Sequence, residues 1–378
     1  MHRTLVAILL TLIGPLTASA VEHVSFRRDG APVHVSGQLV IEAADGGLML
    51  IDEQGKLWTI QKAEQLSRRQ DEQPLRRLEV KELGEAVLKE LPPGFRVHTT
   101  AHYVICYNTS TAYAEWCGGL FERLHRAFTN FWNRKGMEVK DLQGPMVALV
   151  FADKASYRRY AVNELGEAVD SIIAYYNLNT NRIVMYDLTG VQADRAEAPR
   201  RGNAAEINAL LTKPEAANLV ATIVHEATHQ IAYNCGVQTR LADVPVWLSE
   251  GIAMYFETPD LSGSRTWRGV GAINRNRLDQ FRRYSRARPA DSLRKLLSDD
   301  DRLQKTDGIL DAYAESWALT YFLIRQRPKD FVAYMKALAA KSPGLKETPE
   351  ARIQLFEQHF GSIKRLDEDF KRQIIRLK

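Results

Sequence analysis

The spacing of apolar residues divides the chain into a β-rich start, a mixed middle and a helical end. Between a capping residue at Ser110 or Thr111 and a stop at Gly136, apolar side chains recur every three or four positions. This spacing predicts one long helix with a buried face. The residues on that face are Trp116, Leu120, Leu124, Phe128 and Phe131. His125 lies in the same helix and is read as a packed or solvated histidine rather than a ligand.

Residues 21–62 show a different pattern, in which short apolar runs are separated by turn residues. The runs are residues 38–42, 47–51 and 56–60. Turn residues between short apolar runs predict a small β-meander or SH3-like module. Such a module serves either for recognition or as a packing accessory, since nothing in it resembles a catalytic set.

A polar connector and one helix are expected between this module and the rest of the chain. Residues 63–77 are rich in Arg, Gln, Glu and Asp. A helix fits residues 78–91, because the prolines of Pro92-Pro93-Gly94 cannot continue it. We therefore assign residues 63–94 to a connector and helix, and residues 95–378 to the main domain.

The middle of the chain alternates strand and helix patterns. Strands are expected within residues 96–107, 146–151, 171–176 and 182–186, and the last two flank an Asn-rich turn typical of a hairpin. Residues 187–211 read as a loop, a helix follows over 213–234, and helical spacing dominates from about residue 245. The predicted fold is α+β: a small mixed sheet with an antiparallel edge hairpin packed on the 213–234 helix, then a mainly helical C-terminal half.

Residues 1–20 have the features of a secretory signal. A short basic start is followed by an apolar stretch over residues 5–16 and by the small residues Ala18-Ser19-Ala20. The apolar stretch is too short to span a bilayer comfortably as a permanent anchor. We expect cleavage after Ala20, with an uncleaved anchor as the alternative. The mature protein is then exported, periplasmic or secreted, without stable membrane insertion.

The helix over residues 213–234 contains His225-Glu226-Ala227-Thr228-His229, an H-E-x-x-H pattern. Histidines four residues apart lie on the same face of a helix, so both imidazoles can reach one ion while Glu226 leans over its open position. Thr212 and Glu215 match a capping box at the start of this helix. The alternative is two histidines on a buried face that only form hydrogen bonds.

Glu250 is the candidate third ligand. It lies in the apolar segment 244–257, where an unpaired carboxylate would be costly, and Pro245 fits the first turn of a new helix there. Together with His225 and His229 it would leave a fourth coordination position open, which is the layout of a catalytic site for one zinc ion. The alternative is a glutamate in a salt bridge or a cap.

These two motifs, H-E-x-x-H and then P-x-W-L-x-E-G-I-A, resemble those of the gluzincin peptidases, the group that includes thermolysin. The chain is more closely similar to exported bacterial gluzincin-like proteins, over about residues 95–325. The segment from Tyr313 to Leu323 also resembles the helix that these proteins carry beyond the zinc site. In the thermolysin type, an Asp four residues after the glutamate ligand supports a zinc histidine, and here that position is Met254. Glu257 is expected to lie one turn too far to replace it.

The resemblance implies a zinc metallopeptidase that hydrolyses peptides or proteins, with Glu226 as the general base. Tyr313 is the candidate donor to the oxyanion, because related peptidases use a Tyr or His from a downstream helix; a core or rim tyrosine is the alternative. Tyr175 and Tyr176 end the strand that we expect to bind an extended peptide at its edge. The competing functions are a non-catalytic zinc-containing envelope scaffold and a hydrolase of another amide, such as a cell-wall crosslink.

Charge and cysteine content add two open questions. The net charge of +5 gives little reason to expect a nucleic-acid partner. Arginines are concentrated between Arg265 and Arg288, where they either bind a substrate carboxylate or an anionic envelope polymer or form a solvated surface. Cys106, Cys117 and Cys235 allow one disulfide, or are three buried thiols.

Overall fold

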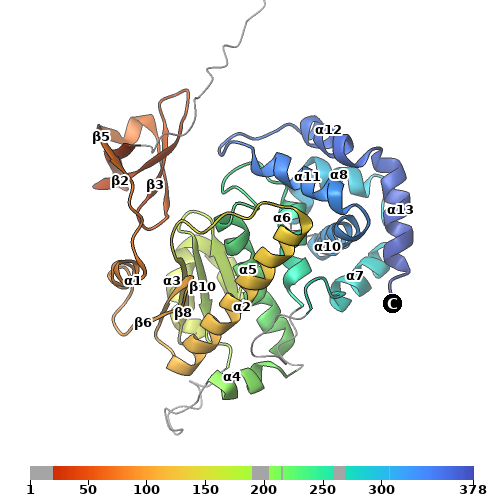
Figure 1. Ribbon diagram of the computed structural model, residues 1–378, viewed down its shortest axis with the longest axis horizontal. Coiled ribbons are helices and arrows are strands. Elements are labelled where there is room, and N and C mark those ends of the chain that lie inside the picture. Colours follow the sequence, from red (N-terminus) through yellow and green to blue (C-terminus); the bar gives the residue numbers. More distant parts are fainter. Residues whose placement is uncertain (1–19, 190–203, 214–215, 259–268, 306) are drawn as a thin grey trace, which may run out of the picture. The chain divides into compact units, whose positions relative to one another are not determined.

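The computed structural model of the protein describes residues 20–189, 204–213, 216–258, 269–305 and 307–378. The expected signal segment lies outside the described residues except for Ala20. The chain divides into two compact units, Met1–Arg77 and Leu78–Lys378 (Figure 1). The division falls within residues 63–94, the range that the sequence assigned to a connector and helix. The fold is mixed α and β, with a β-rich N-terminal region and a helical C-terminal half, as the sequence predicted.

The first unit contains a five-stranded antiparallel sheet. Its strands are β1 (Ala20–Arg28), β2 (Ala31–Glu42), β3 (Leu48–Asp52), β4 (Leu57–Ile60) and β5 (Gln65–Pro74). Their order is β4-β3-β2-β1-β5, so β1 pairs with β2 on one side and with β5 on the other. Side chains of a strand alternate between its two faces, and one face of this sheet buries Val24, Phe26 and Leu50 in a small core.

Strand β5 replaces the polar connector that the sequence predicted. Its register with β1 places Ser67 opposite Ser25. Most of its side chains are exposed, so no apolar alternation marks it as a strand. Backbone pairing with β1 holds it instead, together with an ion pair between Arg68 and the buried Glu22 (Nε–Oε2 2.9 Å). The charged composition indicated a connector, but here it belongs to a solvated edge strand.

The second unit is built on a mixed sheet in the order β6-β7-β8-β10-β9. Its strands are β6 (Arg96–Thr99), β7 (Tyr103–Tyr107), β8 (Met146–Phe151), β9 (Ala174–Asn177) and β10 (Arg182–Tyr186). The three central strands, β7, β8 and β10, are parallel, while β6 and β9 lie antiparallel at the two edges. Parallel neighbours need crossover connections, which helices here provide.

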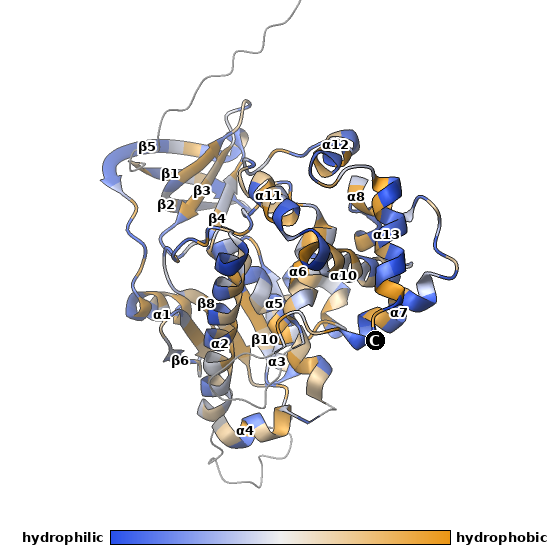
Figure 2. Ribbon diagram, turned by 45° about the vertical axis from the view of Figure 1, so that its right-hand side comes forward, coloured by the Kyte–Doolittle hydropathy of each residue, from blue (hydrophilic) through white to orange (hydrophobic). Residues whose placement is uncertain are grey.

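Helices pack against both faces of this sheet. They are α1 (Val80–Leu88), α2 (Thr111–Lys135), α3 (Lys154–Leu165) and α5 (Ala217–Asn234). Helices α2 and α5 share a core with Ile105 and Ile183, while α1 and α3 share one with Val104 and Val184. Because successive side chains face opposite sides, strands buried on both sides are apolar throughout. The hydrophobic colour of β10 in Figure 2 illustrates this pattern.

Strands β9 and β10 form the predicted hairpin, but β9 is shorter than expected. Ser171, where the strand was expected to begin, instead follows a short 3-10 helix. At the turn, the side chain of Asn177 accepts hydrogen bonds from the backbone N–H groups of Asn179 and Thr180, both at 2.8 Å. Asn181 adopts a positive φ of 60°, which asparagine tolerates well.

Helix α5 begins four residues later than predicted and without the predicted capping box. Its N-cap is Ala216, which has no polar side-chain atom. The Thr212 hydroxyl donates to the Ala209 carbonyl (3.1 Å), so this threonine ends the preceding helix α4 (Ala204–Leu211). Helix α4 lies in a stretch that the sequence indicated as loop. Glu215, the other member of the predicted capping box, lies outside the described residues.

The C-terminal half is helical, with α10 at its centre. The helices are α6 (Val246–Phe256), α7 (Arg275–Tyr284), α8 (Ser292–Ser298), α9 (Asp301–Gln304), α10 (Ile309–Gln326), α11 (Pro328–Ala339), α12 (Pro349–Phe360) and α13 (Ile363–Ile375). Helix α10 packs on α6, α7, α9, α11 and α13. Among the helices that the structure describes, none is long and apolar enough to cross a bilayer.

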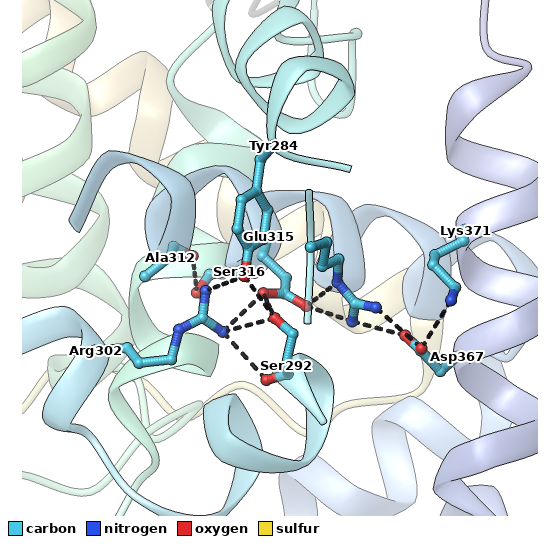
Figure 3. Close-up of polar contacts among 9 residues, drawn as sticks. Tyr284, Ser292, Arg302, Ala312, Glu315, Ser316, Asp367 and Lys371 are labelled. Atoms are coloured by element: carbon cyan, nitrogen blue, oxygen red, sulfur yellow. Dashed lines mark hydrogen bonds and ion pairs between the residues drawn. The ribbon is translucent and has the colours of Figure 1, made fainter. Parts of the chain in front are cut away.

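A buried ion network ties α10 to the helices around it (Figure 3). Glu315, which is fully buried, accepts hydrogen bonds from Arg288 (2.5 Å), Arg302 (2.7 Å) and Ser292 (2.7 Å). Arg288 also pairs with Asp367 of α13 at 2.7 Å. Since a buried charge is stable only when it is paired and hydrogen-bonded, these five residues hold one another in place.

Candidate metal centre

Helix α5 presents its two histidines from a buried position. Its apolar residues pack in the core of the second unit, and they include Val220, Ile223, Val224, Ala227 and Ile231. The helix ends at Asn234 as expected, and Gly236 follows with a φ of 75°. A helix buried in this way holds His225 and His229 in fixed positions one turn apart.

Helix α6 brings Glu250 to the same point, and a close approach to α10 fixes its position. Gly251 lies against α10 so tightly that a Cβ atom there would be 2.0 Å from the Thr320 hydroxyl oxygen and 2.8 Å from the Ser316 carbonyl oxygen. Only glycine fits such an approach of two backbones. The ligand position next to it is therefore set by the packing of α6 on α10.

The three candidate ligands converge at the spacing that a bound ion requires. The Nε2 atom of His225 lies 3.0 Å from Oε2 of Glu250, and Nε2 of His229 lies 3.4 Å from its Oε1. The two Nε2 atoms are 3.2 Å apart. Tetrahedral ligands about 2.0–2.1 Å from an ion are separated by roughly 3.3 Å, so the set fits a metal ion. All three side chains keep between 11% and 16% exposure, which leaves the site accessible from solvent.

The charges at the site are strongly coupled. Burial alone would lower the pKa of His225, but hydrogen bonds to Glu250 and Glu257 raise it well above its usual range. Burial alone would raise the pKa of Glu250, but the adjacent histidines hold that pKa far below its usual value. The negative charges that raise the pKa of His225 are the same charges that would attract a metal cation to this point.

Glu226 lies between the site and the edge strand β9. Its Oε2 accepts a hydrogen bond from the backbone N–H of Tyr176 (2.8 Å). Burial raises the pKa of Glu226, although the nearby His225 and His229 act against this. A carboxylate with a raised pKa is better matched to accepting a proton near neutral pH.

Glu257 supports His225, and the expectation that it lies too far away was wrong. Its Oε2 lies 2.9 Å from Nδ1 of His225, which leaves Nε2 of that ring for an ion. Glu257 directly follows the last residue of α6 and lies seven positions after Glu250, so both carboxylates project from the same face of that helix. Asn274 donates to its Oε1 at 2.6 Å, and Arg277 lies 3.5 Å from the same atom.

His229 has a neutral support that the sequence reading missed. Its Nδ1 lies 3.2 Å from the hydroxyl of Ser249, which donates in turn to Oε1 of Gln238 (3.2 Å). Because the serine hydroxyl donates to Gln238, it accepts the hydrogen on Nδ1 of His229. The Nε2 atom of that ring is then left for the ion. Met254, at the position where thermolysin-type peptidases carry an Asp, is instead fully buried in the core. The sequence held one signal for the support of His229, which is that Ser249 directly precedes the candidate ligand Glu250.

Tyr313 lies near the site on the first turns of α10 and is partly buried. Burial raises its pKa, and the negative charges of Glu250 and Glu226 raise it further. The guanidinium of Arg277 lies over its ring, 5.4 Å from the ring centre. Arg277 therefore contacts both this tyrosine and the carboxylate that supports His225.

The two tyrosines of the edge strand face opposite sides of the sheet. The Tyr175 side chain packs on the side of α3 and donates to Glu164 at 2.5 Å, so it points away from the metal ligands. Tyr176 lies on the α5 side, where its ring stacks on Tyr233 with ring centres 5.9 Å apart. Of the pair, Tyr176 is thus the residue that reaches the site, through its backbone N–H.

The arginine-rich segment is partly occupied by contacts within the chain. Arg288 belongs to the buried ion network, Arg277 pairs with Glu257, and Arg282 donates to the Ile375 carbonyl at 3.2 Å. Arg265 and Arg268 lie outside the described residues. An anionic polymer would therefore meet fewer free guanidinium groups than the sequence indicates.

The three cysteines are all buried free thiols. None of the three, all of which the structure describes, forms the disulfide that the sequence allowed. Burial raises the pKa of Cys106 and that of Cys235, each to about 12, so neither is a reactive thiolate.

Removing the carboxylate that supports His225 should weaken metal binding without abolishing it. We expect Glu257→Ala to lower the affinity for the ion about 10- to 100-fold, as is usual when such a support is lost. Glu257→Gln keeps an acceptor for the Nδ1 hydrogen and should have a smaller effect. Competition with a coloured chelator measures both, with the exposed Glu115→Ala as a control. Equal affinities for Glu257→Ala and the control would contradict this role.

Comparisons with known proteins match part of the chain. A family described as a protein of unknown function (DUF1570) matches residues 219–344. A search of curated proteins finds no match. The matched range contains α6 and α10 and most of α5, and with them the three candidate ligands and Glu257, while the sheet lies outside it. The part of this chain that is similar to the DUF1570 family thus includes these ligands together with the helices from α6 to α11.

Proposed function

We propose that the protein is an exported zinc-dependent peptidase. The observation that carries the proposal is the convergence of His225, His229 and Glu250 at separations of 3.0–3.4 Å. Two imidazoles and one carboxylate are typical ligands of catalytic zinc, which keeps its fourth position for water or substrate. A structural zinc site would instead be closed by four protein ligands.

The residues around the ligands suit the hydrolysis of an amide. Bound zinc would supply Lewis acidity and lower the pKa of a water molecule towards 7. Glu226 accepts a proton from the attacking water at its carboxylate and returns it to the leaving nitrogen. The backbone N–H of Tyr176 orients Glu226 for this role. Tyr313 is the candidate donor to the carbonyl oxygen on which negative charge develops.

The substrate class follows from the edge strand. Strand β9 pairs with β10 on one side, and the N–H of Tyr176 points away from that pairing towards Glu226. An extended peptide could lie along the same edge and be held by its backbone, which would make recognition tolerant of sequence. A peptide or protein is therefore the proposed substrate, and the signal-like first 20 residues support a periplasmic or secreted location.

A metal analysis followed by a peptide digest tests this function. The purified protein should contain one zinc ion per chain and cleave a mixture of peptides. A chelator should remove both the metal and the cleavage, and added Zn²⁺ should restore them. The variant His229→Ala should behave like the chelated protein.

Each competing function has its own outcome in this experiment. An envelope scaffold would retain one zinc ion yet cleave nothing. A hydrolase of another amide would leave linear peptides intact but cleave cell-wall crosslinks in a metal-dependent way. Peptide cleavage that continues in the metal-free protein would contradict the proposal outright.

A further inference from the structure

A second group of metal-binding side chains lies on α2, away from the residues of the centre just described. It consists of His102, in the turn between β6 and β7, and of Glu122 and His125 on one face of α2. One ligand-type atom from each of the three lies within 4.8 Å of the others. All three side chains are partly exposed, so an ion could reach them from solvent.

Packing fixes the turn against the helix. A Cβ atom at Gly118 of α2 would lie 2.8 Å from the side-chain methyl carbon of Thr100, so the turn approaches the helix as closely as glycine allows. Glu122 then binds the turn with three hydrogen bonds. Its Oε1 accepts from the Thr100 hydroxyl and from the His102 backbone N–H, both at 2.7 Å, and its Oε2 lies 2.7 Å from Nδ1 of His102.

The contact with Glu122 prepares His102 as a metal ligand. A carboxylate that binds the Nδ1 hydrogen directs the lone pair of the ring to Nε2, and metal-binding histidines usually have such a partner. His125 is the neighbour of that ring, with centres 4.2 Å apart and planes inclined by 32°. Ligand nitrogens bind an ion in the plane of their rings, so two rings that lie over one another at this tilt need a side-chain rotation of His125 to share an ion. Its partial exposure permits that rotation.

We propose that His102 and His125 form a second binding site for a late first-row transition ion, with Glu122 holding His102 in place. Two imidazoles with water at the remaining positions favour Cu²⁺, Ni²⁺ or Zn²⁺ over Mg²⁺ or Ca²⁺. The site binds more weakly than the first, because it has fewer charged ligands and its rings must rearrange. Its ligands lie on α2 and the β6–β7 turn, so its occupation is independent of the peptidase function.

Metal titration of the full chain tests the second site. Equilibrium dialysis against buffered Zn²⁺, and separately Cu²⁺, should give two equivalents per wild-type chain in two steps. His125→Asn and His102→Asn should each weaken the second step about tenfold or more and leave the first unchanged. His229→Ala should remove the first step and leave the second, and the exposed Glu115→Gln should change neither.

Two results would overturn the inference. One is a single equivalent in the wild-type chain at saturating metal. The other is a second equivalent that keeps its affinity in both His102→Asn and His125→Asn, since the ion would then be bound elsewhere. A thermal melt of each variant in the absence of metal checks the fold. If His102→Asn melts early, Glu122→Gln serves instead, because it keeps an acceptor for His102 yet should still weaken the second step.

Discussion

Replacing Glu226 by glutamine is expected to lower peptide hydrolysis about 10²- to 10⁴-fold while the protein keeps its zinc. Glutamine has the same shape, and its amide oxygen can still accept the hydrogen bond from Tyr176 N–H that the carboxylate accepts now at 2.8 Å. It cannot take a proton from water. The loss should therefore appear as a lower kcat, with metal content and melting temperature close to those of the wild type.

The control for this variant is Glu115→Gln, which makes the same chemical change at an exposed position of α2. It should keep full activity. Measuring zinc content and peptide cleavage on the same samples separates the two roles of the H-E-x-x-H motif, because the histidines bind the ion and Glu226 moves the proton. Hydrolysis at the wild-type rate in Glu226→Gln would remove Glu226 from the mechanism.

Replacing Glu315 by alanine is expected to lower the free energy of unfolding by about 3–5 kcal/mol. Glu315 has no exposed surface and accepts hydrogen bonds from two arginines and a serine. Its removal leaves the positive charges of Arg288 and Arg302 partly uncompensated in the interior. Glu315→Gln keeps the shape and part of the hydrogen bonding, so it should lose less. Urea unfolding followed by circular dichroism measures both variants.

A surface ion pair provides the comparison for Glu315. Asp301 of α9 pairs with Lys305, the residue that follows this helix, and more than half of each side chain is exposed. Lys305→Ala should change the free energy of unfolding by less than about 1 kcal/mol, because solvent screens such pairs. If Glu315→Ala were as mild as this control, the network of Figure 3 would add little to the stability of the helical half.

The parts of the fold that the sequence predicted well are those with buried apolar faces. The long helix α2 begins after Ser110, whose side chain accepts from the Tyr113 backbone N–H, and ends at Gly136 with a φ of 85°. Such caps and apolar spacing are local, so the sequence alone reveals them. Strand β5 is held instead by pairing with a distant strand and by charged contacts. Its composition carried no signal of either, and a connector was predicted in its place.

The candidate site also has a part that the sequence predicted and a part that it did not. The four residues His225, Glu226, His229 and Glu250 follow from two short motifs whose spacing is set by helix geometry. The support from Glu257 does not follow from them, because it depends on how α6 packs against α5, which brings His225 within reach of a carboxylate two turns beyond Glu250. The contact of His229 with Ser249 depends on the approach of α6 to α5. Contacts between elements require the packed structure.

Gly251 limits how this site can be redesigned. A side chain there would collide with Thr320 and with the backbone of Ser316, so α6 and α10 would have to separate. Because Glu250 precedes it on the same helix, any such separation would also carry the carboxylate away from the two histidines. Libraries that aim to change metal preference can vary the ligand itself, but they must keep the glycine after it. Grafting the site onto another protein would require copying the contact surface of α10 as well as the ligands.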